Sequence, residues 1–426
     1  MHVKNTIKKR SLLQRLYDGI KKEFRALGPG FITGSADNDP SGIGTYSLAG
    51  AKYGPLMLWL LPFQLPLMYA VQIMSARIGL VTGKGLAANM KDYFPKPILY
   101  SAIAILVIAN TINIGADISI MAASMQLVFG YQIYFWAIFT TLIMIALEIF
   151  VSYRTYSRLL LFLSSFLIAY IITGLLTTDD WGKVIQHTFT PYIQCDKEFL
   201  LIAAGFVGTT ISPYLFFWQA SQEIEEKLDH KTEDEIKELI EKMPKDTWIG
   251  MFFSQFVALF IVLTCYSALH KNGITTIDSA YDAAIALQPF AGKFAYIIFS
   301  VGIIGAGLLG IPILAGASAY ALAEIFDYPR SLAHKFHQAK FFYGVIAIST
   351  LLGLCINFMG INPIQALLYA AIVNCFAAVP FILFLLILAN KKELMGEFSN
   401  GYGINFLGIV TFFLMTTAAL LPLWCR

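Results

Sequence analysis

Long apolar segments, separated by short charged loops, recur along the whole of this 426-residue sequence. Each is long enough for a helix to cross a hydrocarbon core about 30 Å thick. Hydrophobic residues make up 57% of the chain and charged residues 13%, which excludes an ordinary soluble domain. We therefore predict an all-α polytopic membrane protein with about eleven spans. The segments cover residues 31–52, 57–81, 98–127, 132–152, 157–178, 199–222, 248–269, 292–325, 341–359, 363–390 and 403–424.

The distribution of basic residues predicts the orientation of the chain. Residues 1–27 form a basic tail without the apolar core of a signal peptide, so we expect this tail in the cytoplasm. Lys and Arg resist translocation, and they are concentrated after the second, fourth, eighth and tenth spans, which would then face the cytoplasm. An odd number of spans places the C-terminus outside, and the pattern suits the inner membrane of a prokaryote. The basic residues are Arg77, Lys84, Lys91, Lys96, Arg154, Arg158, Arg330, Lys335, Lys340, Lys391 and Lys392.

Several kinds of site are missing from the sequence. It has no GxxxxGK[ST] phosphate-binding loop, so we expect no ATP-driven step. The cysteines show no CxxC spacing, and the histidines form no cluster. We expect no enzyme activity, no cofactor and no nucleic-acid partner, and a monomer in the lipid bilayer.

The first predicted span is interrupted by the stretch ADNDPSG at residues 36–42. An ionised carboxylate at membrane depth costs on the order of 3 kcal/mol, which makes Asp39 a functional candidate. Pro40 removes a backbone hydrogen bond and Gly42 loosens the turn, so we expect the helix to unwind beside the acid. Freed carbonyl oxygens are tolerated at this depth only where protein or a watery cavity faces them. Together with a carboxylate they are oxygen ligands, so the stretch predicts half of a cation site.

A second interrupted span supplies the other half of the predicted site. Residues 205–222 read GFVGTTISPYLFFWQASQ, in which polar residues and Pro213 break an apolar helix. Many secondary transporters place two such broken helices at equivalent positions of inverted repeats. We therefore predict that each broken span opens a repeat of five helices.

The predicted organisation follows from these two repeats. The segment 223–247 is highly charged and helical in pattern, and we expect a solvated cytoplasmic helix there. The predicted segments are the tail at 1–27, the first repeat at 28–178, an external loop at 179–198, the second repeat at 199–390 and an eleventh span with the C-terminus at 391–426.

Three stretches resemble the NRAMP divalent-metal transporters. They are GPGFITGSADNDPSGIGTYSLAGAKYG at 28–54, VQIMSARIGLVTGKGLA at 71–87 and GASAYALAEIF at 316–326, and the similarity runs over nearly the whole chain. The resemblance implies a LeuT-type fold, with two inverted five-helix repeats, an eleventh helix and breaks in helices 1 and 6. It also implies alternating access around a metal ion bound midway between these two helices.

The sequence departs from this family at two ligand positions. Typical members read Asp-Pro-Gly-Asn in span 1 and Met-Pro-His in span 6, whereas this chain reads DPSG at 39–42 and SPY at 212–214. The acid is kept, but an amide and a thioether are absent. A thioether favours transition metals, whereas Mg²⁺ prefers oxygen ligands and gives up its water reluctantly. The combination resembles the NRAMP-related magnesium transporters, for which Mg²⁺ and Mn²⁺ are the implied substrates.

The resemblance assigns roles to single residues. Asp39 is the anionic ligand or the anchor of a hydrated ion. The family positions imply the backbone carbonyls of Ala36 and Thr209 as further ligands, and a span 10 amide that is matched here by Asn374. Gly42 stands where the family has its span 1 amide. The hydroxyl groups able to hold water around the ion belong to Ser41, Thr210 and Ser212.

We do not expect transport to be coupled to protons. The span 6 histidine of the family is replaced by Tyr214, and a tyrosine pKa of about 10 suits proton transfer poorly near neutrality. In span 3 the family's first acid is kept as Asp117, but its second is replaced by Ile120. Asp117 and Tyr214 are expected to line the ion path, unless Asp117 is simply a buried acid bonded to Asn113.

Asp37 and Asn38 complete the polar break, although the family does not require both. Helical spacing turns Asp37 roughly 200° away from Asp39. We expect Asp37 and Asn38 to line the vestibule of the site. The alternative is that Asp37 caps the end of the half-helix.

Three other functions remain open. The nearest is a proton-coupled Mn²⁺ or Fe²⁺ importer of the ordinary NRAMP type, against which the missing Met and His argue. A LeuT-type carrier of an organic substrate would bind a carboxylate at half-helix N-termini, and Asp39 would repel that group. An intramembrane aspartyl protease using Asp39 and Asp117 would need two close carboxylates and usually has a GxGD motif, which the sequence lacks.

Overall fold

The computed structural model describes residues 28–151, 165–227, 232–332 and 334–424. In this part of the chain every regular element is a helix, and nine helices are long and apolar enough to cross a membrane. The predicted class, an all-helical multi-pass membrane protein, is therefore confirmed. The predicted tail at 1–27, together with Arg154 and Arg158, lies outside the described residues.

The helices of the first half follow the predicted spans, with the first span divided into two helices. An additional short helix, α5, links the second and third spans, and α10 lies in the predicted external loop. The helices are α2 (Pro29–Ala36), α3 (Pro40–Tyr53), α4 (Leu60–Thr82), α5 (Leu86–Tyr93), α6 (Lys96–Phe129), α7 (Ile133–Phe150), α9 (Ile168–Thr177) and α10 (Trp181–Phe189), with 3₁₀ turns at Gly54–Met57 and Ser165–Leu167.

The second half contains the second divided span. Here too the chain breaks where the sequence predicted, between α11 and α12. The helices are α11 (Lys197–Thr210), α12 (Pro213–Lys227), α13 (Glu233–Ala268), α14 (Ala280–Ile285), α15 (Gln288–Ala291), α16 (Ala295–Ile325), α17 (Lys340–Ile356), α18 (Pro363–Ala389), α19 (Lys392–Met395) and α20 (Tyr402–Trp424), with 3₁₀ turns at His270–Asn272, Gly292–Phe294, Asn357–Met359 and Gly396–Phe398.

The predicted charged loop at 223–247 is not a separate element. Its second half is the start of α13, which begins at Glu233 behind a capping box formed by Thr232 and Glu235 and continues through Pro244 into the apolar span. The predicted boundary at 247 therefore falls inside a helix. Hydropathy marks where water gives way to lipid, but a helix can cross that border without interruption, because its backbone hydrogen bonds are internal.

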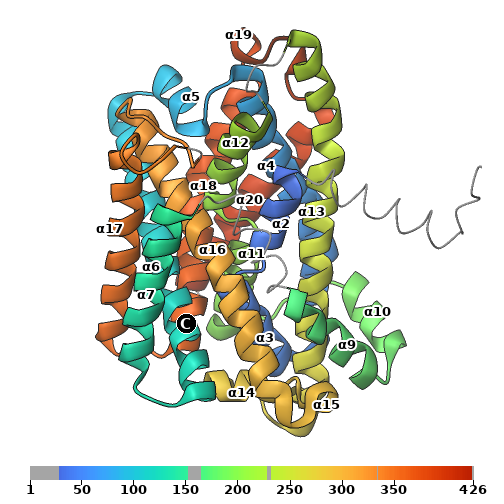
Figure 1. The fold of residues 1–426 in the computed structure, drawn as a ribbon. Helices are drawn as coiled ribbons and strands as arrows, with labels where there is room; N and C mark the ends of the chain where they lie inside the picture. Colours follow the sequence, from blue (N-terminus) through green and yellow to red (C-terminus); the bar gives the residue numbers. More distant parts are fainter. Residues whose placement is uncertain (1–27, 152–164, 228–231, 333, 425–426) are drawn as a thin grey trace, which may run out of the picture.

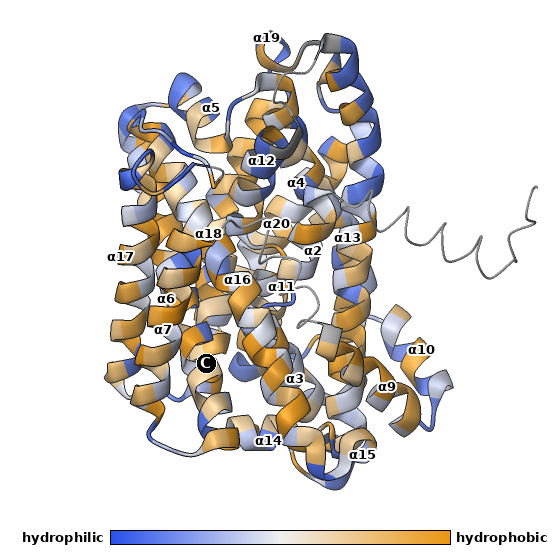
Figure 2. Ribbon diagram, in the orientation of Figure 1, coloured by the Kyte–Doolittle hydropathy of each residue, from blue (hydrophilic) through white to orange (hydrophobic). Residues whose placement is uncertain are grey.

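The long helices run between two ends of the molecule. One end carries α5 and α19, and the other carries α14 and α15 (Figure 1). Hydrophobic residues cover the helices between the ends, and hydrophilic residues are concentrated at the ends (Figure 2). Inside, α2 packs against α13, α12 packs against α4 and α16, and α3 and α11 both pack against α18. The two broken helices are thus enclosed by the other helices.

The short half-helix α2 is anchored to α13 by a close crossing of backbones. A Cβ atom added to Gly34 would lie 2.2 Å from the carbonyl carbon of Gly250, and one added to Gly250 would lie 2.2 Å from the carbonyl oxygen of Gly30. The carboxylate of Asp246 in α13 accepts hydrogen bonds from the N–H groups of Gly28 and Gly30, at 2.8 and 2.9 Å. An eight-residue helix is too short to be stable alone, so α13 fixes its position.

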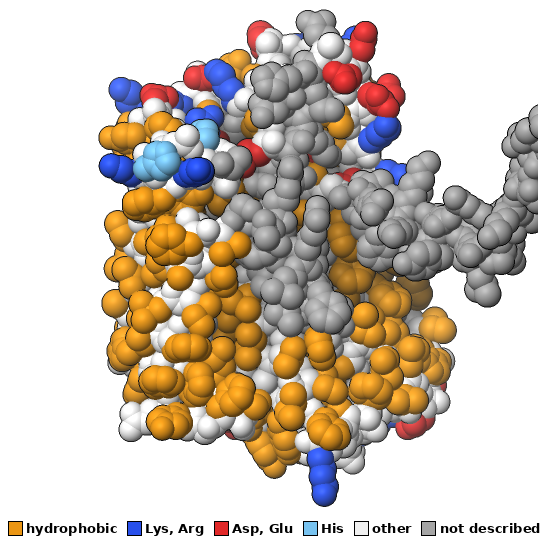
Figure 3. All heavy atoms as spheres, viewed as in Figure 1, with side chains coloured by type: hydrophobic (Ala, Val, Ile, Leu, Met, Phe, Trp, Pro, Cys, Tyr) orange, Lys and Arg blue, Asp and Glu red, His pale blue; other side chains and the backbone are white. Residues whose placement is uncertain are grey.

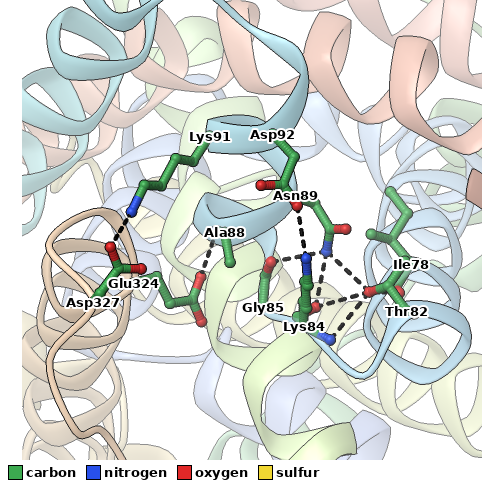
Figure 4. A network of polar contacts seen from close by, with 10 residues as sticks. All are labelled: Ile78, Thr82, Lys84, Gly85, Ala88, Asn89, Lys91, Asp92, Glu324 and Asp327. Carbon is green, nitrogen blue, oxygen red and sulfur yellow. Dashed lines mark hydrogen bonds and ion pairs between the residues drawn. The ribbon is translucent and has the colours of Figure 1, made fainter.

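The connecting helix α5 is held against the end of α16 by a polar network (Figure 4). The buried carboxylate of Glu324 accepts a hydrogen bond from the N–H of Ala88 at 3.0 Å and forms an ion pair with Arg330 at 3.2 Å. Lys91 pairs with Asp327 at 2.5 Å. The network attaches the connection between α4 and α6 to α16.

We predict that Gly250→Ala destabilises the protein, because even one added carbon meets the backbone of α2. The expected loss is about 2 kcal/mol, seen as a fall of about 4 °C in the melting temperature of the purified protein. Gly344→Ala on α17 is the matched control, since a Cβ atom there has nothing within 4 Å. Equal melting temperatures for the two variants would contradict the close crossing.

Candidate functional site

The first break leaves three residues, 37–39, between α2 and α3. Asp39 is the N-cap of α3, and its Oδ1 accepts a hydrogen bond from the N–H of Gly42 at 2.8 Å. Pro40 occupies the first helical position, where its missing N–H is harmless and its fixed φ suits the start of a helix. The order Asp-Pro therefore starts a new helix at membrane depth and directs the carboxylate of Asp39 into the protein interior.

The other oxygen of Asp39 faces two helices from elsewhere in the chain. Its Oδ2 accepts hydrogen bonds from Nδ2 of Asn113 in α6, at 3.2 Å, and from the hydroxyl of Tyr214 in α12, at 3.3 Å. The same hydroxyl lies 3.5 Å from the carbonyl oxygen of Ala36. Ala36 and Tyr214, both predicted from the family positions, therefore lie beside Asp39.

Asn113 joins Asp39 to two further predicted residues. Its Nδ2 also donates to Oδ2 of Asp117 at 3.2 Å, and its Oδ1 accepts a hydrogen bond from Nδ2 of Asn374 in α18 at 2.8 Å. Asn374 thus reaches Asp39 through Asn113. Among the described residues, Oδ1 of Asp117 and Oδ1 of Asn374 are buried without a hydrogen-bond partner. Both are acceptors available to the water molecules of a hydrated ion.

The second break brings its polar residues to two different places. The hydroxyl of Ser212 bonds to the carbonyl oxygens of Gly208 and Thr209, at 2.7 and 2.9 Å. The hydroxyl of Thr210 instead contacts the hydroxyl of Tyr46 at 2.7 Å and Nε2 of Gln64 at 3.0 Å. Ser212 lies in the unwound segment, whereas Thr210, the last residue of α11, belongs to a separate polar network with α3 and α4. None of the hydrogen bonds described for Thr210 reaches Asp39, so its role at the ion stays a prediction.

Asp37 and Asn38 face α13 on another side of the break. The hydroxyl of Ser254 donates a hydrogen bond to Oδ2 of Asp37, and Nδ2 of Asn38 lies 3.5 Å from the carbonyl oxygen of Ser254. Asp37 is the C-cap residue of α2 by position, but its side chain is bonded to α13. Both side chains are buried. Ser41 in turn donates to the carbonyl oxygen of Leu367 in α18, at 3.4 Å.

Three buried carboxylates at the break, those of Asp37, Asp39 and Asp117, determine its electrostatics. Among the described residues none of them forms an ion pair. The described residues also hold no group of three His, Cys, Asp or Glu side chains placed around one point. Around Asp39 lie the amide N–H of Asn113, the hydroxyl of Tyr214 and the carbonyl oxygen of Ala36. The carboxylate, hydroxyl and carbonyl oxygens suit a hard divalent cation that keeps part of its water.

Two residues of the site were absent from the predicted ligands. Asn113 precedes Asp117 by four residues on α6, and this spacing places both on one helix face, a signal present in the sequence. Nothing in the sequence around Gly310 of α16 indicates that it belongs to the site. A Cβ atom there would lie 3.0 Å from Cβ of Asp39 and 3.9 Å from Oδ2 of Asp117, so the backbone of α16 forms one wall of the site.

The sequence matches one family over most of its length. A profile of the family described as natural resistance-associated macrophage protein-like, or Nramp, matches residues 30–424. The chain is 27% identical, over 397 residues, to the divalent metal cation transporter MntH of Yersinia pestis (strain Pestoides F). The match covers 91% of this chain and 92% of that protein.

Solved structures share the arrangement of helices. The manganese transporter of Eremococcus coleocola, solved with an aromatic bis-isothiourea compound, has a TM-score of 0.79 at 16% identity, over 96% of this chain and 87% of that one. MhsT in complex with L-phenylalanine has a TM-score of 0.65 at 12% identity, over 92% and 98% of the chains. At such identities the likeness concerns the fold alone, and it confirms the predicted LeuT-type fold.

We predict that Gly310→Ala weakens the binding of a divalent cation about tenfold, a loss near 1.4 kcal/mol, because the added carbon displaces Asp39. The measurement is the rise in melting temperature with Mg²⁺ concentration, since a ligand of the folded state stabilises it. Gly302→Ala on the same helix is the control, because its Cβ would meet its nearest atom at an ordinary 3.5 Å. A Mg²⁺ response that Gly310→Ala leaves unchanged would show that α16 does not bound the site.

Proposed function

This chain belongs to the Nramp family, and from that premise we propose that it carries divalent metal ions, Mg²⁺ first and Mn²⁺ second, across a membrane by alternating access. The observation that carries the proposal is the buried carboxylate of Asp39, bonded at an unwound helix break to amide and hydroxyl donors. The relative named above is a divalent metal cation transporter, and the solved neighbour a manganese transporter. The proposed preference for Mg²⁺ over Mn²⁺ rests on the chemistry of this site.

The preference for Mg²⁺ is supported by the absence of a sulfur ligand from the contacts described for Asp39. Where the family has a methionine, Ser212 offers a hydroxyl, which here bonds to backbone carbonyls. Oxygen donors do not discriminate in favour of transition metals as thioethers do. Neutral amides and hydroxyls around one carboxylate also suit an ion that retains water, as Mg²⁺ usually does.

Transport without protons is supported by the groups beside Asp39. Where the family has a histidine, Tyr214 places a phenol 3.3 Å from the carboxylate. Where the family has a second acid in span 3, Ile120 is buried and apolar. The remaining driving forces are the ion gradient and the membrane potential, which favour entry of a divalent cation into the cell.

The orientation of the protein follows from charge. On the face shown in Figure 3, Lys and Arg side chains gather at the α5 end. Because basic residues are retained in the cytoplasm, we assign the α5 end to that side. With this assignment and an odd number of spans, the C-terminus is proposed to lie outside. The bacterial relative favours the inner membrane of a prokaryote.

Alternating access requires contacts that can close either side of the site, and two sets of contacts support the proposal. Beside the second break, α11 lies so close to α18 that a Cβ atom on Gly208 would meet the carbonyl oxygen of Ala371 at 2.2 Å. Toward the α5 end, the hydroxyl of Tyr320 in α16 donates to Glu225 in α12 at 2.7 Å, and its ring contacts that of Trp218. If the contacts on one side of the site open while those on the other side stay closed, the ion can leave on the open side.

The aspartyl protease alternative is disfavoured by the same geometry. Asp39 and Asp117 do lie around one point, but the amide nitrogen of Asn113 stands between them and donates to both. A proteolytic pair instead shares a proton directly between two carboxyl groups. The relative that spans 91% of the chain is a transporter, not an enzyme.

The deciding experiment is Mg²⁺ uptake into proteoliposomes, followed by an internal Mg²⁺ dye and a parallel internal pH dye. We expect saturable Mg²⁺ entry without acidification, and its loss in Asp39→Ala. Asp179→Ala is the control, because that carboxylate is exposed and pairs with Lys271 at the molecular end. Mn²⁺ entry with acidification, and no Mg²⁺ entry, would instead identify a proton-coupled transition-metal importer.

We also predict that Ser212→Met shifts selectivity toward softer ions. A thioether at this place should raise Cd²⁺ and Mn²⁺ uptake relative to Mg²⁺ by about tenfold, because sulfur binds such ions preferentially. Ser212→Leu, of similar volume and without sulfur, separates this effect from steric change. If the Met and Leu variants show the same ion ratio, Ser212 does not face the ion.

A further inference from the structure

The amide of Asn113 lies between the two carboxylates of the proposed ion site. Its Nδ2 is 3.2 Å from Oδ2 of Asp39 and 3.2 Å from Oδ2 of Asp117. We infer that Asn113 is a specificity-determining residue, which holds these carboxylates too far apart to bind one bare ion together. An ion bound at Asp39 then meets Asp117 through water. This inference rests on the proposed transport of divalent ions and concerns how the site selects among them.

The orientation of the Asn113 amide is determined by its three partners. Ionised carboxylates only accept hydrogen bonds, so the NH₂ group must face Asp39 and Asp117. The carbonyl oxygen of the amide accepts from Nδ2 of Asn374, at 2.8 Å, which is consistent with this orientation. Both N–H bonds are thereby used, one for each carboxylate. Asn374 acts as a positioning residue for Asn113.

The distances set the spacing of the two acids. The two N–H bonds of a planar amide diverge by about 120°, so two oxygens at this range lie on the order of 5.5 Å apart. Mg²⁺ holds its ligands at about 2.1 Å, so two ligands on opposite sides of the ion are about 4.2 Å apart. A bare ion cannot touch both carboxylate oxygens at that spacing. A water molecule between the ion and one of the carboxylates fills the difference.

Hydrogen-bond acceptors for such water are present beside the amide. Oδ1 of Asp117 and Oδ1 of Asn374 are buried, and neither has a partner among the described residues. Water bound to a divalent cation donates strongly and needs acceptors of this kind. The backbone of α16 at Gly310 lies against both acids and limits how far they can rearrange. The amide of Asn113 acts as a spacer between the two carboxylates. It therefore favours an ion that keeps its water, and Mg²⁺ keeps water more readily than transition metals do.

Asn113→Ala tests the inference through the ratio of two ions. Without the spacer the two carboxylates can close on one dehydrated ion, so Mn²⁺ uptake should rise relative to Mg²⁺ uptake by about tenfold or more. Asn110→Ala is the matched control. That amide is equally buried one turn earlier on α6 and bonds to Leu314 and Ser318 of α16, but the structure shows no bond from it to either acid.

The outcomes separate the inference from the proposed function. If the unaltered protein carries no divalent ion, the proposed function fails, whatever the variants do. If it does carry them, and Asn113→Ala lowers Mg²⁺ and Mn²⁺ uptake in the same proportion, Asn113 is only structural and the inference is overturned. Should Asn113→Ala not fold, Asn113→Ser keeps one donor for one carboxylate. It must then give a smaller shift of the ratio in the same direction, and an unchanged ratio refutes the inference.

Discussion

The carboxylate of Asp39 at membrane depth is the constraint on which the rest of the structure depends. An acid in a medium of low dielectric constant is stable only if donors or a cation surround it. Here the N–H of Gly42 bonds one oxygen, and Asn113 and Tyr214 bond the other. The first of these donors exists only because α3 starts anew at Pro40. Unwinding the helix is therefore what makes the buried acid possible.

A broken helix in turn needs anchors, because each half is too short to hold its place alone. The half-helix α2 obtains its anchor from α13, through the backbone contact of Gly34 with Gly250 and the cap from Asp246. The half-helices α3 and α11 obtain theirs from α18. The helix α13 packs against α3 as well as α2, so both halves of the first broken span rest on one long helix.

Besides the contacts of Asp37 and Asn38 with α13, the polar residues around the breaks form two networks. One contains Asp39, Asn113, Asp117 and Asn374 and offers unpartnered acceptors. The other joins Thr210 to α3 and α4 through hydroxyl and amide contacts. A break that exposes polar backbone must be satisfied on every side, since no water is present in the hydrocarbon region. Only the first network places two carboxylates around one point, which is why it is the one suited to a divalent ion.

The sequence by itself determined the features that depend on local composition. The length of the hydrophobic segments predicted the membrane class and the spans. The polar interruptions at 36–42 and within 205–222 predicted the two divided helices, because a proline removes a backbone hydrogen bond in any fold. Asp39 was identifiable because a charge in an apolar span is costly on any fold. The similarity of three stretches to a known family added the LeuT-type arrangement.

Only the tertiary structure decided which distant side chains meet. It placed Asn113 between the two acids and Gly310 against them, turned Thr210 toward α4, and directed Asp37 to α13. These contacts depend on how each helix is rotated and shifted against its neighbours. In a span that is apolar on nearly all sides, the sequence contains no polar face to fix that rotation, so the packing of whole helices determines it.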